Sequence, residues 1–201
     1  MSKFIIIAVI VAIAAIGGYL ASPLFYETEV NEPLPTALNQ IEPGLTFEKF
    51  TEMPDEQREP IVEKMSEEVK DMIMEKAAPM IILVSETMDE MVKDSEPSIK
   101  IFKSGTFEGL AGHDAEGIAK IIQVNDMNFL RFENFQVTNG PDLRVYITPD
   151  GDVKNGIHLE KLKGSKGDQN YSLDGVDVGV YDTVVIYCQP FGVYFGQAEL
   201  I

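Results

Sequence analysis

Residues 118–137, IAKIIQVNDMNFLRFENFQV, decide the expected fold of the C-terminal half of this chain. Apolar and polar side chains alternate on both sides of Asn125-Asp126, a pair of typical turn residues. Phe132 and Phe135 interrupt the alternation, because they lie three positions apart where one strand face requires two. This spacing predicts a β-bulge near Glu133-Asn134. The stretch therefore predicts two strands with a turn between them.

The same period of two recurs in short runs from residue 99 to residue 200, separated by turns rich in Gly, Asn, Asp and Pro. Short strands at this spacing, without helices between them, predict an all-β antiparallel sandwich or barrel-like domain over residues 98–201. The expected strands are Ile99–Phe102, Ile118–Val124, Phe129–Val137, Leu143–Ile147, His158–Leu162, Tyr171–Leu173, Thr183–Cys188 and Phe191–Leu200.

Residues 46–96 have a helical period instead, and they predict an α-helical hairpin that packs on itself or on the β domain. Pro54 and Asp55 suit the start of the first helix, and Pro79 ends it. Most of the nine methionines lie here on the apolar stripe, so we expect them to fill a core rather than bind copper. The apolar positions are Ile61, Met65, Val69, Met72 and Ile73 in the first helix, and Met80, Leu83, Val84, Met88, Met91 and Val92 in the second.

Residues 4–21, FIIIAVIVAIAAIGGYLA, carry no charge. At about 1.5 Å per residue a helix of this length covers about 27 Å, close to the thickness of a hydrocarbon core. Lys3 precedes the segment and Glu27, Glu29 and Glu32 follow it, so the positive-inside rule places the N-terminus in the cytoplasm. We expect residues 1–21 to be a single-pass transmembrane anchor with an extracytoplasmic body. A cleaved signal peptide is the alternative, although the candidate cleavage sites near Ala21 are poor.

Residues 22–45 contain several prolines and predict an extended spacer between the anchor and the body. The formal net charge of the whole chain is −17. Such an acidic protein repels phosphate backbones, and nucleic acid is therefore excluded as an expected partner.

Cys188 is the single cysteine, so no intramolecular disulfide can form. It shares a strand face with Val184 and Ile186, which predicts apolar surroundings. Pro190 follows, and because proline does not continue a central strand we expect a bend where the thiol could reach a surface. Two interpretations stay open: a reactive redox thiol, which Lys161, Lys163 or Lys166 could approach in space, and a small buried hydrophobic residue.

Other candidate sites are weaker. A blue-copper centre would need Cys188 with His113, His158 and a Met, yet no His or Met follows Cys188, so we expect no metal site. The Asp150–Gly156 turn lacks the calcium-loop ligand pattern. Asn170-Tyr171-Ser172 is a glycosylation sequon or simply part of a strand. No nucleophile elbow, HExxH pair or P-loop occurs, so the chain does not have the motifs of an ordinary hydrolase or NTPase.

The stretch from Phe102 to Leu200 resembles the DM-thirteen domain, a family labelled an electron-transfer domain. One departure is Tyr187, where many members carry Trp before the cysteine. The resemblance rests on Gly105-Thr106-Phe107, Gly112-His113, Asn139–Tyr146, Leu162–Tyr171 and Tyr181–Phe191, continuing through Val193, Phe195, Ala198 and Leu200.

This resemblance implies a β-sandwich-like fold and a redox role centred on Cys188. A redox partner would then have to supply any metal or haem, because this chain lacks a full ligand set, and the sequence identifies no cofactor of its own. The alternative function is a non-catalytic cell-surface binding or scaffold module. It would use the β-domain loops or the acidic residues Glu63, Glu67 and Glu75 of the helical region.

Overall fold

The computed structural model describes residues 33–89 and 99–201, and the chain from Leu34 onward forms one compact unit. The anchor expected at residues 1–21 lies outside the described residues, as do residues 22–32 of the spacer expected at residues 22–45. Within the ranges 33–89 and 99–201, no helix is both long enough and apolar enough to cross a membrane.

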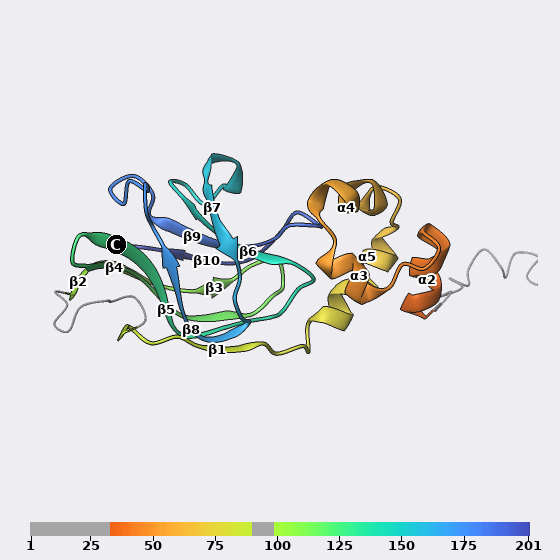
Figure 1. Ribbon diagram of the computed structural model, residues 1–201, viewed down its shortest axis with the longest axis horizontal. Helices are drawn as coiled ribbons and strands as arrows, with labels where there is room; N and C mark the ends of the chain where they lie inside the picture. Colours follow the sequence, from red (N-terminus) through yellow and green to blue (C-terminus); the bar gives the residue numbers. More distant parts are fainter. Residues whose placement is uncertain (1–32, 90–98) are drawn as a thin grey trace, which may run out of the picture. The chain divides into compact units, whose positions relative to one another are not determined.

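Ten strands form two five-stranded sheets among the described residues (Figure 1). The first sheet has the order β1-β8-β5-β4-β2 and the second sheet has the order β3-β10-β9-β6-β7. All pairs are antiparallel except β1 with β8. The strands are β1 Leu83–Ser85, β2 Ile99–Thr106, β3 Glu108–Gly109, β4 Ala115–Val124, β5 Met127–Val137, β6 Leu143–Thr148, β7 Ile157–Lys161, β8 Lys166–Ser172, β9 Thr183–Cys188 and β10 Val193–Glu199.

The two sheets pack face to face, so the expected sandwich is confirmed, whereas the barrel-like alternative is wrong because both sheets stay open at their edges. Alternating residues of β4, β5, β6, β9 and β10 point inward and form one continuous core, as the period of two requires. Edge-to-face contacts join Phe107 to Phe132 and Phe135. The largest fully buried members of this core include Ile121, Leu130, Phe132, Phe135, Ile147, Tyr171 and Phe195.

The expected bulge is confirmed in β5. Glu116 pairs with Gln136 and Ile118 pairs with Glu133, so one residue of β4 faces two residues of β5. Asn134 takes a positive φ of 50° at this point, and the bulge turns both Phe132 and Phe135 toward the core. The three-residue spacing of the two phenylalanines therefore has a direct structural cause.

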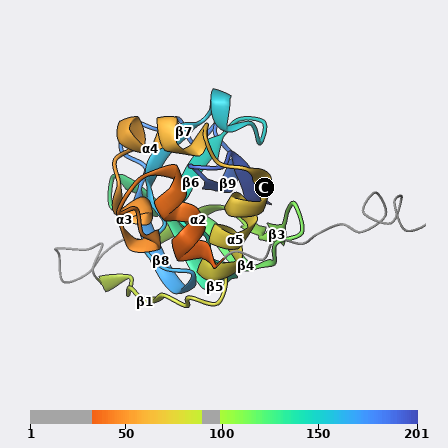
Figure 2. The same ribbon diagram turned by 90° about the vertical axis from the view of Figure 1, so that its right-hand side faces the viewer.

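Four short helices precede the sandwich in the described part of the chain, and Figure 2 shows them grouped in front of the sheet ends. Thr46 and Ser66 cap two of them by accepting hydrogen bonds from the backbone N–H of Lys49 and Val69. Pro54 precedes the third, as expected. The helices are α2 Leu34–Ile41, α3 Phe47–Glu52, α4 Asp55–Val62 and α5 Glu67–Ala77, and their shared core contains Leu38, Leu45, Phe47, Phe50, Ile61, Met65, Ile73 and Ala77.

The predicted helical hairpin over residues 46–96 is wrong. Its first helix, expected to run from Asp55 to Pro79, is divided into α4 and α5, because the chain starts a new helix after the N-cap Ser66, and its second helix does not form. Helix α5 ends at Ala77, just before Pro79 as expected, but the chain then becomes extended and forms β1 on the edge of the first sheet. Backbone hydrogen bonds to β8 decide this conformation, since Lys166 donates to the carbonyl of Ile82 and Glu86 donates to the carbonyl of Asp168. The second helix was predicted from the spacing of nearby apolar residues. That spacing contains no information about β8, the strand with which this segment pairs.

The spacer prediction for residues 22–45 is wrong over α2. Proline at position 35 falls in the first turn of this helix, where the missing N–H costs nothing. Leu38 is fully buried and joins the helical core, so the helical part of the chain begins earlier than the sequence suggested.

The docking of β1 depends on glycine at position 167. Its φ is +113°, and a Cβ there would lie 1.9 Å from the carbonyl oxygen of Val84. We expect Gly167→Ala to lower the free energy of unfolding by about 2 kcal/mol or more, because it adds a backbone clash to an unfavourable φ. Urea unfolding measures the loss of stability. Faster hydrogen exchange at the Glu86 amide, which donates to β8, shows that β1 is the part that loosens.

Gly175→Ala is the matched control. Gly175 also has a positive φ of 75°, but nothing lies within 4 Å of its Cβ position. Gly175→Ala should lower the free energy of unfolding by about 1 kcal/mol, from the backbone conformation alone. Hydrogen exchange at the Glu86 amide should not change. Equal effects of the two substitutions would contradict the steric role of Gly167.

Candidate functional site

Cys188 lies at the end of β9, with its side chain inside the sandwich. It shares the inward face with Val184 and Ile186, and all three are fully buried. Its backbone pairs with Leu143 of β6 and Val193 of β10. The expectation of apolar surroundings is confirmed, whereas the expected exposure next to Pro190 does not occur in this conformation.

Hydrogen bonding from the backbone N–H groups of Phe191 and Asp142 acts to lower the pKa of the Cys188 thiol. Burial nevertheless raises the pKa of the Cys188 thiol to about 12, because the two N–H groups compensate only part of the desolvation of a thiolate. The thiol is therefore protonated at neutral pH while the fold is closed. Its surroundings still differ from those of an ordinary buried hydrophobic residue, since they contain donors for a negative sulfur.

A cluster of four charged side chains, two buried and two partly exposed, lies beside this strand end. Arg58 of α4 binds Asp142, and both side chains are 2% exposed. Arg144 binds the same carboxylate at 2.9 Å and reaches Asp55 at 2.6 Å. The cluster joins helix α4 to the loop before β6. Asp142, whose backbone N–H acts on the Cys188 thiol, belongs to this loop.

The electrostatics of this cluster favour its ionised form. Burial on its own would raise the pKa of Asp142, but hydrogen bonds from Arg144 and Arg58 outweigh it and the pKa is lowered. A hydrogen bond from Arg144 is the main cause of the lowered pKa of Asp55. Among the described residues, Nη1 of Arg58 and Nε of Arg144 are buried without a hydrogen-bond partner, so the cluster is not fully satisfied.

The cation nearest to this site differs from the lysines that the sequence suggested. Lys161 reaches the cluster at 3.4 Å from Asp142, but Lys163 binds Glu86 of the segment after β1. Two members of the cluster act on the Cys188 thiol through their charges: Asp142 raises its pKa, and Arg58 lowers it by less. Sequence reasoning missed Arg58, whose only signal was a long basic side chain three residues after Asp55 in a predicted first turn.

A second contact holds the helices over the same end of the sandwich. The rings of Phe50 in α3 and Phe191, just after β9, stack with centroids 5.9 Å apart. Arg58 lies over the Phe50 ring at 5.8 Å. Because Phe191 also supplies one of the N–H groups at the sulfur, the helical part and the surroundings of Cys188 are directly connected.

An aromatic group covers the opposite, outer face of the second sheet. The ring of Tyr187 contacts those of Tyr146 and Tyr194 edge-on, at 5.9 and 5.1 Å. The His158 ring lies 5.1 Å from that of Tyr146. Tyr187 follows the strand alternation, so it points outward where its neighbour Cys188 points inward.

The two histidines occupy separate places. His113 stacks on the ring of Phe195 at 3.7 Å, and partial burial lowers its pKa. His158 lies on the outer face, where burial also lowers its pKa. In the part of the chain that the structure describes, no three His, Cys, Asp or Glu side chains gather as a metal site would require.

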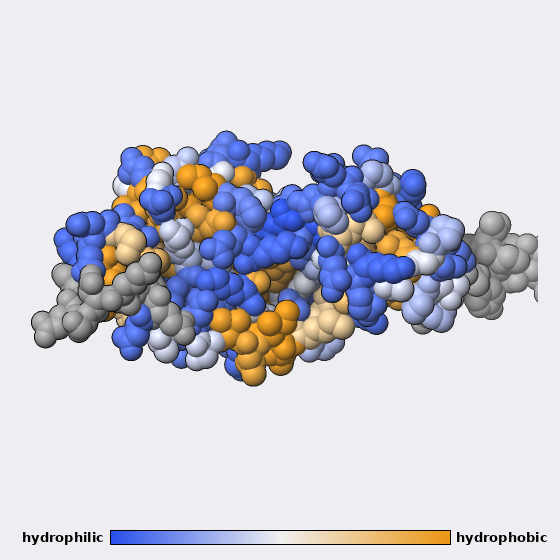
Figure 3. Space-filling model, viewed as in Figure 1, coloured by the Kyte–Doolittle hydropathy of each residue, from blue (hydrophilic) through white to orange (hydrophobic). Residues whose placement is uncertain are grey.

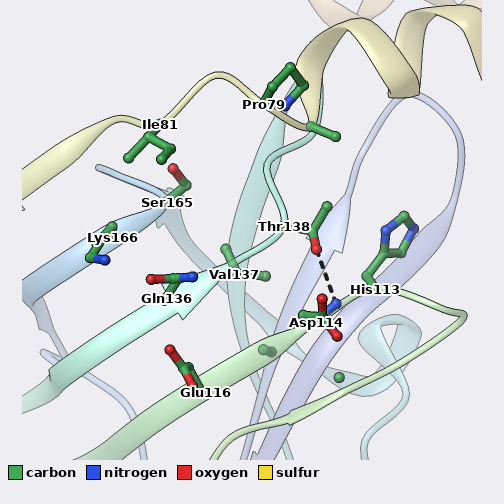
Figure 4. A pocket seen from close by; sticks show the side chains of 13 residues that line it. Pro79, Ile81, His113, Asp114, Glu116, Gln136, Val137, Thr138, Ser165 and Lys166 are labelled. Carbon is green, nitrogen blue, oxygen red and sulfur yellow. Dashed lines mark hydrogen bonds between the residues drawn. The ribbon is translucent and has the colours of Figure 1, made fainter.

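A groove of about 770 Å³ lies beside His113 (Figure 4). The segment between α5 and β1 forms one side, including Pro79 and Ile81, and the turn before β4 forms the other. Glu116, Gln136 and Lys166 line it, and Asp114 donates its backbone N–H to the hydroxyl of Thr138. Its walls are mixed in polarity and do not include Cys188.

The glycosylation sequon is structural. Asn170 is 7% exposed in β8, and its side chain accepts from Arg131 and donates to the carbonyl of Thr87. The Asp150–Gly156 turn is closed by its own side chains, since Asn155 donates to Asp150 and Lys154 donates its backbone N–H to Asp152. Neither segment presents a free ligand set.

Comparison with known proteins gives one match. Residues 106–200 match the family model described as "Electron transfer DM13". The match contains β4 to β10 and Cys188, so the resemblance inferred for the C-terminal part of the chain is confirmed. No curated protein and no solved structure matches the chain at a significant level.

The buried pair predicts a large effect of Arg58 on stability. Arg58→Met keeps the length of the side chain but leaves the Asp142 carboxylate with one guanidinium fewer, and we expect a loss of about 3 kcal/mol. Lys70→Met is the control, because it breaks an exposed pair with Glu67 and should cost at most about 0.5 kcal/mol. Denaturant unfolding measures both, and similar losses would contradict the structural role of the cluster.

The lowered pKa values of Asp142 and Asp55 predict the pH dependence of this contribution. A carboxyl whose pKa is lower in the folded state stabilises the fold above its unfolded-state pKa, about 4, and this stabilisation is lost as pH falls through the folded value. The stability difference between the native chain and Asp142→Asn should therefore be largest near neutral pH and shrink below about pH 4. Asp126→Asn, in an exposed turn, is the control, and a pH-independent difference for Asp142→Asn would contradict the assignment.

Proposed function

We propose that this chain is an electron-transfer accessory protein, on the premise that its residues 106–200 match the electron-transfer DM13 family model and contain Cys188. Cys188 is the proposed redox centre. This position is supported by hydrogen bonding from the backbone at Phe191 and Asp142, which acts in favour of a thiolate. Among the described residues no three His, Cys, Asp or Glu side chains come together to hold a metal ion, and we propose that a partner contributes any metal or haem.

The proposed step is thiol–disulfide exchange. The Cys188 thiol loses its proton to water and the sulfur attacks one sulfur of a partner's disulfide. The partner's other sulfur leaves as a thiolate, and a mixed disulfide joins the two proteins. The partner is thereby reduced at one sulfur while Cys188 is oxidised, and no other reagent is required.

Burial of the thiol places a condition on this step. With Cys188 fully covered, reaction requires a local opening of the strand end rather than a change elsewhere. Two contacts connect the helices to this end, namely Arg58 with Asp142 and Phe50 with Phe191. We propose that partner docking loosens these contacts.

We also propose that the protein acts at a membrane, with residues 4–21 as a single-pass anchor and the body on the extracytoplasmic side. The uncharged segment and the acidic residues after it support this arrangement. Release of the full-length chain from membranes by alkaline carbonate would contradict anchoring.

The second candidate function is a non-catalytic binding module, and the burial of Cys188 favours it. In that case the cysteine is a core residue and the loops or the acidic helical surface, including Glu63, Glu67 and Glu75, hold a partner. The reactivity of the thiol separates the two functions.

The deciding experiment follows reaction of the full-length native chain with an aromatic disulfide, which models the partner. With a thiol pKa of about 12, the thiolate fraction at pH 8 is about a thousandfold below that of an ordinary thiol. We expect slow but measurable mixed-disulfide formation, none in Cys188→Ser, and a reaction at least about tenfold faster in Arg58→Met.

Gly167→Ala is the matched control, since it destabilises the first sheet through the contact of β8 with Val84 and removes neither Arg58–Asp142 nor Phe50–Phe191. Under the proposal, Arg58→Met accelerates the reaction far more than Gly167→Ala does after both are corrected for global stability. If the thiol of every variant reacts only at the rate of global unfolding, the redox proposal fails and the binding module stands.

A further inference from the structure

An apolar surface surrounds β1 on the edge of the first sheet, and Figure 3 shows it as a hydrophobic group where β1 lies. Leu83 is 73% exposed and Ile81 is 68% exposed, so most of the surface of both apolar residues faces solvent. Met80 and Ile82 extend the surface, which we call the β1 edge (residues 80–85). Contiguous apolar surface of this kind marks an interaction site.

The backbone of β1 is also available. Ile82 and Glu86 hydrogen-bond to β8, so in this parallel pairing the even-numbered residues face β8. The N–H and C=O groups of Leu83 and Ser85 therefore point away from β8, toward an edge where no further strand pairs with β1 within residues 33–89 and 99–201. The β1 edge can thus accept another strand by backbone hydrogen bonding as well as by apolar contact.

The other sheet edges are protected against such pairing, which makes the β1 edge exceptional. Strand β2, at the opposite edge of the first sheet, has a register shift between Ile101 and Lys103 and exchanges hydrogen bonds between Ser104 and Ile201. In the second sheet, β3 has two residues and β7 ends in Glu160-Lys161. Bulges and charges are two usual devices against edge pairing, and β1 has neither between residues 80 and 85, although it has only three residues.

The charge distribution indicates what kind of strand fits. Residues 77–85 carry no charge in a chain of formal net charge −17, and the next residue, Glu86, is neutralised by Lys163. Two copies of this acidic chain can therefore approach each other at the β1 edge without opposing charges in the contact. A strongly charged partner would gain nothing from this surface.

We propose that the β1 edge is a homodimer interface, in which β1 of one copy pairs antiparallel with β1 of a second copy across a twofold axis at Val84. In this register Leu83 lies opposite Ser85 of the second copy, and both residues have their backbone groups directed outward. The pairing is self-complementary, as an isologous interface requires. It joins the first sheets of the two copies into one continuous sheet.

The first test compares two exposed apolar residues on opposite edges of the same sheet. Leu83→Lys places a charge in the proposed interface, whereas Ile101→Lys, at a residue that is 57% exposed in β2, does not. We expect the full-length chain to be dimeric by sedimentation, and Leu83→Lys to raise the dimer dissociation constant at least about tenfold. Ile101→Lys should leave it unchanged, and because both variants keep residues 4–21, any dimerisation through that segment affects them equally.

The second test addresses the register. In a Cys188→Ser background, Val84→Cys places a thiol on the twofold axis at a non-hydrogen-bonded position, where two Cα atoms approach to about 4.5 Å. We expect rapid oxidation to a disulfide-linked dimer, and much slower linkage for Leu83→Cys, which lies opposite Ser85 instead. A monomeric full-length chain, or equal linkage of both variants, overturns the proposal.

Other occupants of the β1 edge would be recognised by the same variants. If the native chain is monomeric and Leu83→Lys instead reduces binding to zwitterionic lipid vesicles, the surface contacts a membrane and the homodimer is rejected. None of these outcomes depends on Cys188, so failure of this proposal leaves the redox proposal untouched.

Discussion

The buried charge pair between Arg58 and Asp142 fixes how the helical part of the chain lies on the sandwich. Both side chains are almost completely removed from solvent, so neither can lose its partner without leaving a charge in a poorly polarisable environment. Arg144 and Asp55 extend the pair across the junction between the helices and the strand end. The position of helix α4, the closure over Cys188 and the backbone donors at its sulfur all follow from this one contact.

Several strands could be predicted because the alternation of apolar and polar residues within a strand shows which side chains are buried. Alternation in residues 118–137 marks which side chains face the core, and the odd spacing of Phe132 and Phe135 even locates the bulge. Residues 80–89 could not be predicted in the same way. Met80, Leu83, Val84 and Met88 fit a helix by spacing, but hydrogen bonds to β8 and the space above Gly167 select an extended conformation. That information lies in a distant part of the chain.

For the candidate site, the direction of the Cys188 side chain could be predicted from its own strand, but the access of solvent to it could not. Strand alternation was enough to direct Cys188 inward with Val184 and Ile186. The bend at Pro190 suggested access to the surface, yet access depends on what covers the bend, and here Phe191 packs against Phe50 of a helix far away in sequence. The burial of Arg58 could not be predicted from composition either, because only the fold brings its guanidinium to the carboxylate of Asp142.

The parallel pairing of β1 with β8 has a consequence for synthesis of the protein. Ile82 and its hydrogen-bond partner Ser165 are 83 residues apart, so β1 leaves the ribosome well before the strand that receives it. At usual elongation rates its apolar side chains wait roughly 4–17 s for that strand. Docking of β1 must therefore be among the last steps of folding, and the newly made chain depends on protection of this segment until then.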